Sequence, residues 1–224
     1  MLLTIADILD EKKLANIRKI LESAKFVDGK LSAGSFARRL KNNQEMEQQS
    51  QQAQYLDQLV VGSLAENAIF RNAALPLKVS QPFFARYNDG MSYGDHIDDP
   101  IMGTGGERYR TDVSVTVFLS EPSEYDGGEL VINTTFGQQQ IKLPAGHAVM
   151  YPSSSLHHVA KVTRGNRLVS VLWIQSMVRE PAKREILFEL NQARESLMKR
   201  HPDNPETAQV DHTYVNLVRL WSEV

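Results

Sequence analysis

A histidine and a carboxylate two positions apart, in His96-Ile97-Asp98, form the first candidate for a metal site. On an extended backbone, residues i and i+2 project to the same side of the strand, so both side chains can reach one ion. Most such triplets, however, form one local hydrogen bond or lie on the surface. The triplet therefore predicts a metal site only together with a ligand from elsewhere in the chain.

The pair His157-His158 offers that ligand, and it follows the turn-rich stretch Tyr151 to Ser155. Neighbouring side chains on a strand point to opposite faces, so only one of the two histidines can face the interior. Parity alone does not choose between them. Two histidines and one carboxylate form a facial triad, which suits non-haem iron(II) and leaves positions open for a co-substrate and oxygen.

Arg167 stands ten positions after His157 and begins the apolar run Leu168 to Ile174, with Gly165 predicting a turn just before it. A guanidinium at the start of a buried strand needs an anion, and its planar fork can hold a carboxylate through two hydrogen bonds. An internal salt bridge is the simpler alternative. If a ligand supplies the carboxylate, the anion site lies within one hairpin's reach of the metal ligands.

Short strands separated by turns must position these side chains. The region is typical of an antiparallel sandwich or barrel, of which a jelly roll is one form. The predicted strands are 79–87, 111–119, 129–133, 139–143, 147–151, 157–162 and 168–174. The run 111–119 alternates, with valine and leucine on one face, and the other face carries Asp112, Ser114, Thr116 and Phe118.

Helical periodicity flanks this region on both sides. Asp10 is predicted to cap a first helix that stops at Gly29, and residues 42–64 predict a second helix with a solvated first half. Pro181 and Pro205 mark the starts of two later helices, the second with an apolar stripe predicted to pack onto the sheet. We therefore predict a mainly β fold with flanking helices: an N-terminal helical segment (1–77), a jelly-roll core (78–177) and a C-terminal helical segment (178–224).

Composition excludes several classes of protein. The net charge of −2 gives no basic field, so we expect no nucleic acid and no anionic membrane as partner. The chain has no cysteine, which rules out disulfides, thiolate metal sites and a cysteine nucleophile. The first residues lack the basic region of a signal peptide and no long apolar run occurs, so we predict a cytoplasmic protein without a membrane span.

Motifs along the whole chain resemble one family. They include Arg86-Tyr87, Tyr93-Gly94-Asp95-His96-Ile97-Asp98, Arg110-Thr111-Asp112, Asp126-Gly127-Gly128-Glu129-Leu130, Ser155-Leu156-His157 and Thr163-Arg164-Gly165-Asn166-Arg167. In these motifs the chain resembles the bacterial PKHD-type hydroxylases, relatives of prolyl 4-hydroxylases in the iron(II)/2-oxoglutarate dioxygenase superfamily. Together the motifs are highly specific, although any one alone is not.

The resemblance implies a double-stranded β-helix and roles for five residues. His96, Asp98 and His157 match the iron(II) ligands, Arg167 matches the residue that holds the distal carboxylate of 2-oxoglutarate, and Tyr87 matches a tyrosine that contacts this co-substrate. It also implies hydroxylation of a peptidyl or small-molecule substrate with O2, release of succinate and CO2, and a requirement for L-ascorbate (vitamin C). The primary substrate is not identified.

Two other functions remain open at this point. A cupin-type iron oxygenase would use oxygen without 2-oxoglutarate and would not need Arg167. A non-catalytic jelly-roll module would bind a metal only to order a ligand site. Exposed parts of the terminal helices also leave a homodimer open.

Overall fold

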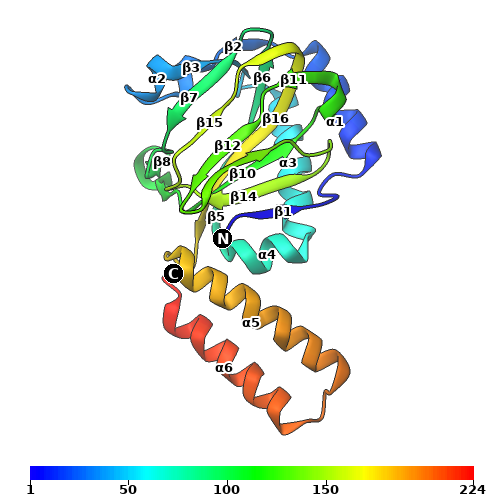
Figure 1. The fold of residues 1–224 in the computed structure, drawn as a ribbon, viewed down its shortest axis with the longest axis vertical. Coiled ribbons are helices and arrows are strands. Elements are labelled where there is room, and N and C mark those ends of the chain that lie inside the picture. Colours follow the sequence, from blue (N-terminus) through cyan, green and yellow to red (C-terminus); the bar gives the residue numbers. More distant parts are fainter.

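Two antiparallel sheets form the centre of the computed structural model, which describes residues 1–224 (Figure 1). The larger, nine-stranded sheet contains, in order, β1 (Leu3–Ile5), β14 (Ala148–Pro152), β10 (Val113–Phe118), β16 (Val162–Ser176), β6 (Phe83–Asn88), β4 (Gln44–Met46) and β2 (Phe26–Asp28). Off this path, β16 also pairs with β5 (Pro76–Val79) and β11 (Tyr125–Gly127). The five-stranded sheet contains β13 (Gly137–Ile141), β12 (Leu130–Thr134), β15 (His157–Val159), β7 (Ser92–His96) and β3 (Lys41–Asn42). A separate pair consists of β8 (Ile101–Met102) and β9 (Tyr109–Arg110).

The two sheets face each other, because one buried cluster takes side chains from both. Phe118 and Val169 of the larger sheet meet Leu130 and Ile132 of the smaller one in this cluster. Each predicted strand between residues 79 and 174 overlaps an observed strand, and the mainly β fold with flanking helices is confirmed. The facing sheets are consistent with a jelly roll.

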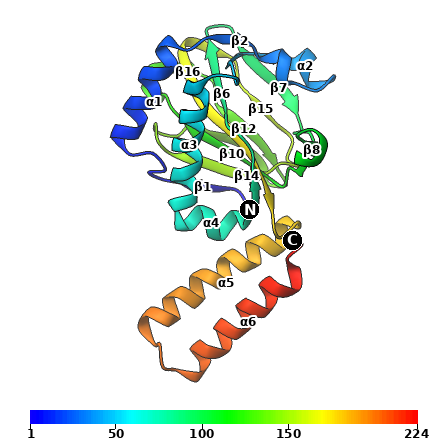
Figure 2. The same cartoon turned by 180° about the vertical axis from the view of Figure 1, so that it is seen from behind.

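Helices cover the outer face of the larger sheet (Figure 2). These are α1 (Glu11–Ser23), α3 (Gln51–Glu66) and α4 (Ala68–Ala74), while the short α2 (Ala37–Leu40) lies near β7. Asp10 caps α1 as predicted, with a carboxylate oxygen 2.7 Å from the amide of Lys13. Apolar residues of α1 and α3 pack against the valine face of β10, so the alternation in β10 separates the helix-facing side from the side that faces the smaller sheet.

The prediction of one helix over residues 42–64 is wrong in its first half. Residues 41–46 form β3 and β4, and the helix begins only at Gln51. Ser50 fixes that start, because its hydroxyl accepts from the amide of Ala53 at 3.0 Å. The N-terminal segment is therefore not helical throughout, since β1, β2, β3 and β4 join the sheets.

Gly165 does not form the predicted turn, because β16 continues through it from Val162 to Ser176. Its φ of +79° lies in the left-handed region, which favours glycine. A Cβ atom here would lie 2.1 Å from the carbonyl oxygen of Glu124. The glycine thus allows β11 to approach β16 closely where β16 leaves the sheet.

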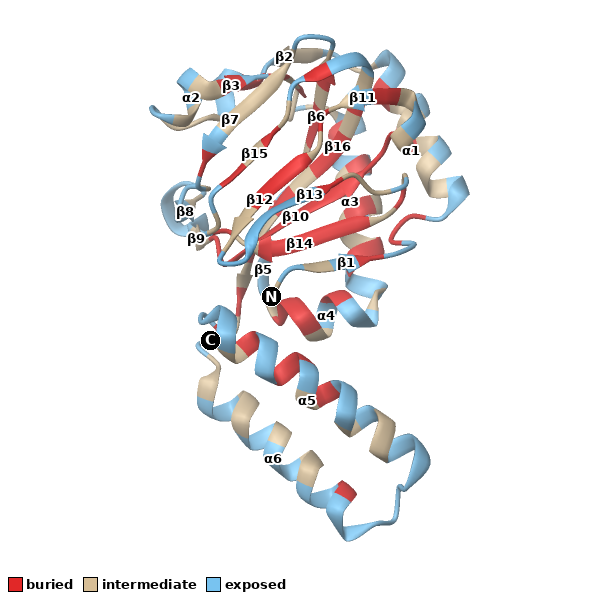
Figure 3. Cartoon of the chain, in the orientation of Figure 1, coloured by how far each residue is buried: buried red, intermediate tan, exposed pale blue.

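The C-terminal helices α5 (Pro181–Arg200) and α6 (Pro205–Trp221) start at the two predicted prolines. They form a hairpin that extends away from the sheets, and α6 is mostly exposed (Figure 3). The apolar stripe of α6 packs with Leu187 of α5 and with Val178, which follows β16, and not onto the sheet as predicted. No helix combines the length and the apolar character that a bilayer crossing requires.

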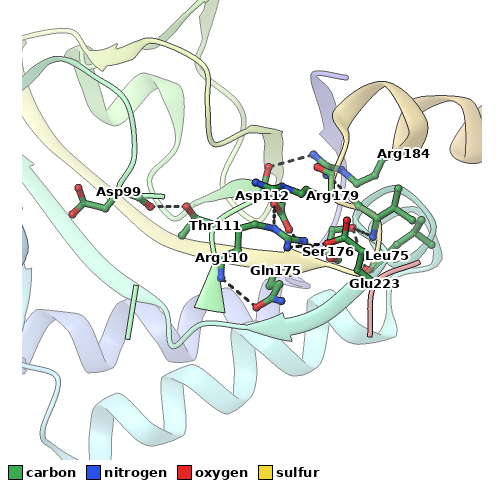
Figure 4. A network of polar contacts seen from close by, with 11 residues as sticks. Leu75, Asp99, Arg110, Thr111, Asp112, Gln175, Ser176, Arg179, Arg184 and Glu223 are labelled. Atoms are coloured by element: carbon green, nitrogen blue, oxygen red, sulfur yellow. Dashed lines mark hydrogen bonds and ion pairs between the residues drawn. The ribbon is translucent and has the colours of Figure 1, made fainter. Parts of the chain in front are cut away.

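A polar network joins this hairpin to the β core (Figure 4). Arg110 donates from Nε to Asp112 at 2.7 Å and from Nη1 to Glu223 at 3.2 Å. Asp112 also accepts from the amide of Ser176 at 2.9 Å, and its carbonyl oxygen accepts from Arg184 at 3.3 Å. Asp112 is the centre of the network because it contacts both the hairpin and β16.

We expect Asp112→Ala to lower the free energy of unfolding by about 3 kcal/mol, because it removes two hydrogen bonds made by a buried carboxylate. Glu223→Ala is the matched control, since Glu223 is 56% exposed and its ion pair with Arg110 contributes about 0–1 kcal/mol. Urea denaturation of both variants measures the difference. Equal losses in the two variants would contradict the central role of Asp112.

Candidate metal centre and co-substrate site

Three side chains with metal-ligating atoms meet where β7 and β15 run side by side. His96 ends β7 and His157 begins β15, and the two residues are direct partners in the antiparallel register. Asp98 follows β7 by two positions, and its Oδ1 lies 3.9 Å from His96 Nε2 and 3.8 Å from His157 Nε2. One ligand atom from each residue lies within 4.8 Å of the others, so a single ion can contact all three.

Backbone carbonyls fix which imidazole nitrogens face this point. His96 Nδ1 lies 2.8 Å from the carbonyl oxygen of Gly94, and His157 Nδ1 lies 3.0 Å from that of Ser155. A carbonyl oxygen can only accept, so both Nδ1 atoms carry a hydrogen and the Nε2 atoms are the nitrogens that face the point where a metal can bind. A metal-bound histidine usually donates a hydrogen bond of this kind from the ring nitrogen that does not bind the metal.

Asp98 is held by Ser114, which in turn contacts Ser153. Its Oδ2 accepts from the Ser114 hydroxyl at 2.5 Å, and that hydroxyl lies 2.8 Å from the hydroxyl of Ser153. The carboxylate therefore turns its other oxygen, Oδ1, toward the histidines. Sequence reasoning placed Ser114 on the polar face of β10 but gave it no role, although a polar face on a buried strand was itself a signal.

Burial keeps His96 uncharged. Desolvation, and next the neighbouring His157, lower its pKa from 6.5 to about 4. The ring of Tyr93 stacks on it with centroids 3.6 Å apart. A neutral imidazole is the form that ligates metals, so the ring is ready to bind an ion near neutral pH.

The same shift makes the metal-free protein sensitive to acid. Between about pH 6.5 and about pH 4 the unfolded chain binds a proton at His96 that the folded chain does not, so stability falls as the pH is lowered. We expect this group to contribute about 2–3 kcal/mol to that loss. Urea denaturation across this range, with His96→Gln as the comparison, measures it. An identical acid dependence in His96→Gln would contradict the shifted pKa.

Arg167 is the largest fully buried side chain, with 1% of its surface exposed. Its Nε and Nη1 atoms have no hydrogen-bond partner. The internal salt bridge, which the sequence left open as an alternative, is thus absent, and a buried cation without an anion is costly unless a ligand supplies one. Tyr87 stands directly opposite Arg167 on β6, and the guanidinium carbon lies 5.0 Å from its ring centroid.

Tyr87 stays protonated at neutral pH, because burial raises its pKa to about 12 even though the charge of Arg167 opposes the rise. Its hydroxyl can therefore donate a hydrogen bond to an anion next to Arg167. The pair offers a charge and a donor at one place, which suits a carboxylate.

One cavity of about 110 Å³ connects the two groups. Its lining includes all five residues singled out from the sequence: His96, Asp98, His157, Arg167 and Tyr87. The remaining histidines lie elsewhere. His158 points away from the cavity and pairs with Asp95 at 2.7 Å, so the register resolves the choice that parity left open.

Three cavity residues were missed in the sequence. Lys41, Asn43 and Glu45 are buried and reach the cavity from the N-terminal segment. The one signal in the sequence is that they stand at every second position, as the residues on one face of a strand do. Because their neighbours are polar too, no contrast between the two faces marks this strand.

The fold and the site define a class of enzyme. Residues 82–175 match the model of the 2OG-Fe(II) oxygenase superfamily, and residues 182–223 match that of the PKHD-type hydroxylase C-terminal domain. The chain is 55% identical over 224 residues to a PKHD-type hydroxylase of Thioalkalivibrio sulfidiphilus, covering all of both chains. It is 43% identical over 223 residues to one of Acinetobacter baylyi, covering 98% of each. The chain belongs to the PKHD-type hydroxylase family and is an oxygenase.

Solved structures share the fold at low sequence identity. A Pseudomonas putida prolyl-4-hydroxylase aligns with a TM-score of 0.51 at 19% identity, over 78% of this chain and 92% of the other. A Trichoplax adhaerens prolyl hydroxylase, in complex with a hypoxia inducible factor peptide fragment, aligns at 0.55 and 18%, over 83% and 86%. The family implies Fe(2+) and 2-oxoglutarate, and the donor set fits them: two imidazoles with a carboxylate suit iron(II), and an unpaired guanidinium suits a carboxylate.

Proposed function

We propose that this protein hydroxylates its substrate with iron(II) held by His96, Asp98 and His157, and with 2-oxoglutarate held by Arg167 and Tyr87. The observation that carries the proposal is one cavity with a convergent ligand set at one point and an unpaired buried guanidinium at another. Iron bound there would supply the oxygen chemistry that couples hydroxylation to the conversion of 2-oxoglutarate into succinate and CO2.

The chain's own residues prepare that chemistry. The carbonyl oxygens of Gly94 and Ser155 orient the two imidazoles, and Ser114 orients Asp98. Arg167 fixes one end of the keto acid, because its fork admits a carboxylate in a single orientation. Apolar residues such as Leu130, Val159 and Val171 line the cavity and exclude water from the reacting groups.

Further features are proposed from the family resemblance alone. L-ascorbate would keep the iron in its reduced state between turnovers. Dioxygen and 2-oxoglutarate are the expected co-substrates, and the choice between a peptidyl and a small-molecule substrate is open. A cytoplasmic location and a homodimer stay predictions.

Anaerobic titration tests the proposal. A weak visible charge-transfer band should appear only when both iron(II) and 2-oxoglutarate are added. His157→Ala should lose the band, whereas the neighbouring His158→Ala should keep it, because His158 pairs with Asp95 outside the cavity. Oxygen consumption without succinate would favour the cupin-type alternative, and metal binding without turnover would favour the non-catalytic module.

A further inference from the structure

Residues 41–45 form a strap between the two sheets. β3 pairs with β7 through Lys41 and Tyr93, and β4 pairs with β6 through Glu45 and Ala85, so the chain crosses from the smaller sheet to the larger one. The side chains alternate, with Lys41, Asn43 and Glu45 buried and lining the cavity. The strap lies outside residues 82–175, which match the oxygenase model. It therefore adds a polar wall to the site that the core strands do not provide.

Lys41 and Glu45 form a buried ion pair on this wall. They are 8% and 7% exposed, and Lys41 Nζ lies 2.5 Å from Glu45 Oε1 and 2.9 Å from the Ser32 hydroxyl. An ammonium has three donors and a carboxylate has two acceptor oxygens. One N–H of Lys41 and the oxygen Oε2 of Glu45 have no partner in the structure. The pair thus keeps one donor and one acceptor side by side.

The strap is close to the iron site. Lys41 Nζ lies 5.4 Å from the centroid of the Tyr93 ring, and that ring stacks on His96. Trp173 also lines the cavity, and its buried indole Nε1 has no hydrogen-bond partner. A molecule placed beside the ligand set would meet the strap on one side and could reach this second unpaired donor.

We infer that the Lys41–Glu45 pair binds an uncharged, amide-linked residue of the primary substrate, with Lys41 donating to the C=O of that residue and Glu45 accepting from its N–H. The inference rests on the proposed function, because it treats the cavity as the reaction chamber. In an extended backbone the N–H and C=O of one residue point to the same side, so together they match the donor and the acceptor that the pair leaves free. The class of substrate is therefore an amide-bearing molecule, either a peptide or a smaller amide.

Charge explains why the group should be neutral. Under the proposed function, the negative charges of Asp98 and of the near carboxylate of 2-oxoglutarate neutralise the charge of iron(II). The far carboxylate of 2-oxoglutarate neutralises the charge of Arg167. Lys41 is already matched by Glu45, so a charged substrate group would have to break a buried pair, which is costly. Asp99, which is exposed and lines the cavity, adds a negative charge that further disfavours an anion.

Binding of three matched probes tests the inference. N-acetylalanine N-methylamide is neutral, N-acetylalanine is anionic and alanine N-methylamide is cationic. Trp173 reports binding through its fluorescence, and Trp221→Phe removes the only other tryptophan. The titration is done without oxygen on the protein loaded with iron(II) and 2-oxoglutarate. We expect the neutral probe to bind about tenfold or more tightly than either charged one.

The double variant Lys41→Met/Glu45→Gln removes both charges and leaves neither unpaired, so it avoids the folding defect of a single substitution. It should bind the neutral probe about tenfold or more weakly. The matched control is Lys25→Met/Glu47→Gln, which removes a pair of similar length (2.9 Å) whose side chains are 71% and 45% exposed. The control should bind the probe as the parent protein does, and thermal unfolding verifies that both variants fold.

Two results would overturn the inference: tighter or equal binding of a charged probe, or unchanged binding of the neutral probe in the double variant. Absence of binding by all three probes would also overturn it. A blocked tetrapeptide amide separates the two sources, since tighter binding than the single-residue probe supports a peptide and equal binding supports a small amide. The visible charge-transfer band tests the binding of iron(II) and 2-oxoglutarate, whereas tryptophan emission tests the binding of the probes. A protein that develops the band but does not bind the neutral probe would therefore contradict the inference and leave the proposed function standing.

Discussion

Replacing Arg167 by alanine should raise the 2-oxoglutarate concentration needed for half-maximal succinate release by about two or more powers of ten. The guanidinium is 1% exposed and two of its nitrogens have no acceptor. Breaking a buried ion pair by removing one partner costs about 3–5 kcal/mol, whereas an exposed pair contributes about 0–1 kcal/mol. Because Arg167 is buried, we expect its replacement to have a large effect on the 2-oxoglutarate requirement. Succinate release measured against 2-oxoglutarate concentration gives the number.

Two variants sharpen this experiment. Arg167→Lys keeps the charge but loses the planar fork, so it should fall between the parent protein and Arg167→Ala. Arg164→Ala is the matched control, because Arg164 lies on the same strand but is 58% exposed and pairs with Asp126. An unchanged 2-oxoglutarate requirement in Arg167→Ala would reject the proposed role.

Part of the site could be predicted from local rules. His96 and Asp98 share a side because they are two positions apart at the end of a strand, and Arg167 is buried because it opens an apolar run. Parity could not choose between His157 and His158, because it gives two faces without saying which is inside, and only the family resemblance pointed to His157. The register, in which His157 pairs with His96, supplies the physical reason.

The strap could not be predicted for a different reason. Lys41 and Glu45 are four positions apart, a spacing that favours an exposed helical ion pair. The glutamine-rich run after them also has no apolar period. Their burial depends on β7 and β6, whose paired residues Tyr93 and Ala85 come 52 and 40 positions later in the chain. Periodicity likewise showed the apolar face of α6 but not its partner, which is α5 and not the sheet.

Asp98→Ala should lower succinate release to background, because it removes the only carboxylate among the three convergent ligands. Substitution of groups that merely orient a metal ligand typically costs about 10–100-fold in affinity or activity, so loss of a ligand should exceed that range. Ser114→Ala provides the intermediate case, because it removes the hydroxyl that donates to Asp98 Oδ2 and leaves the carboxylate in place. The loss of activity should thus be larger in Asp98→Ala, which removes a ligand, than in Ser114→Ala, which removes an orienting group.

A nearby carboxylate provides the control for that ranking. Asp95 lies three residues before Asp98 but is 60% exposed and pairs with His158, so Asp95→Ala should keep nearly full activity. Anaerobic titration should show that Asp98→Ala also fails to develop the visible band, which separates lost metal binding from a defect in turnover. Retained iron-dependent turnover in Asp98→Ala would mean that the ion is held elsewhere, because two imidazoles alone leave a divalent cation in a buried site without a matching negative charge.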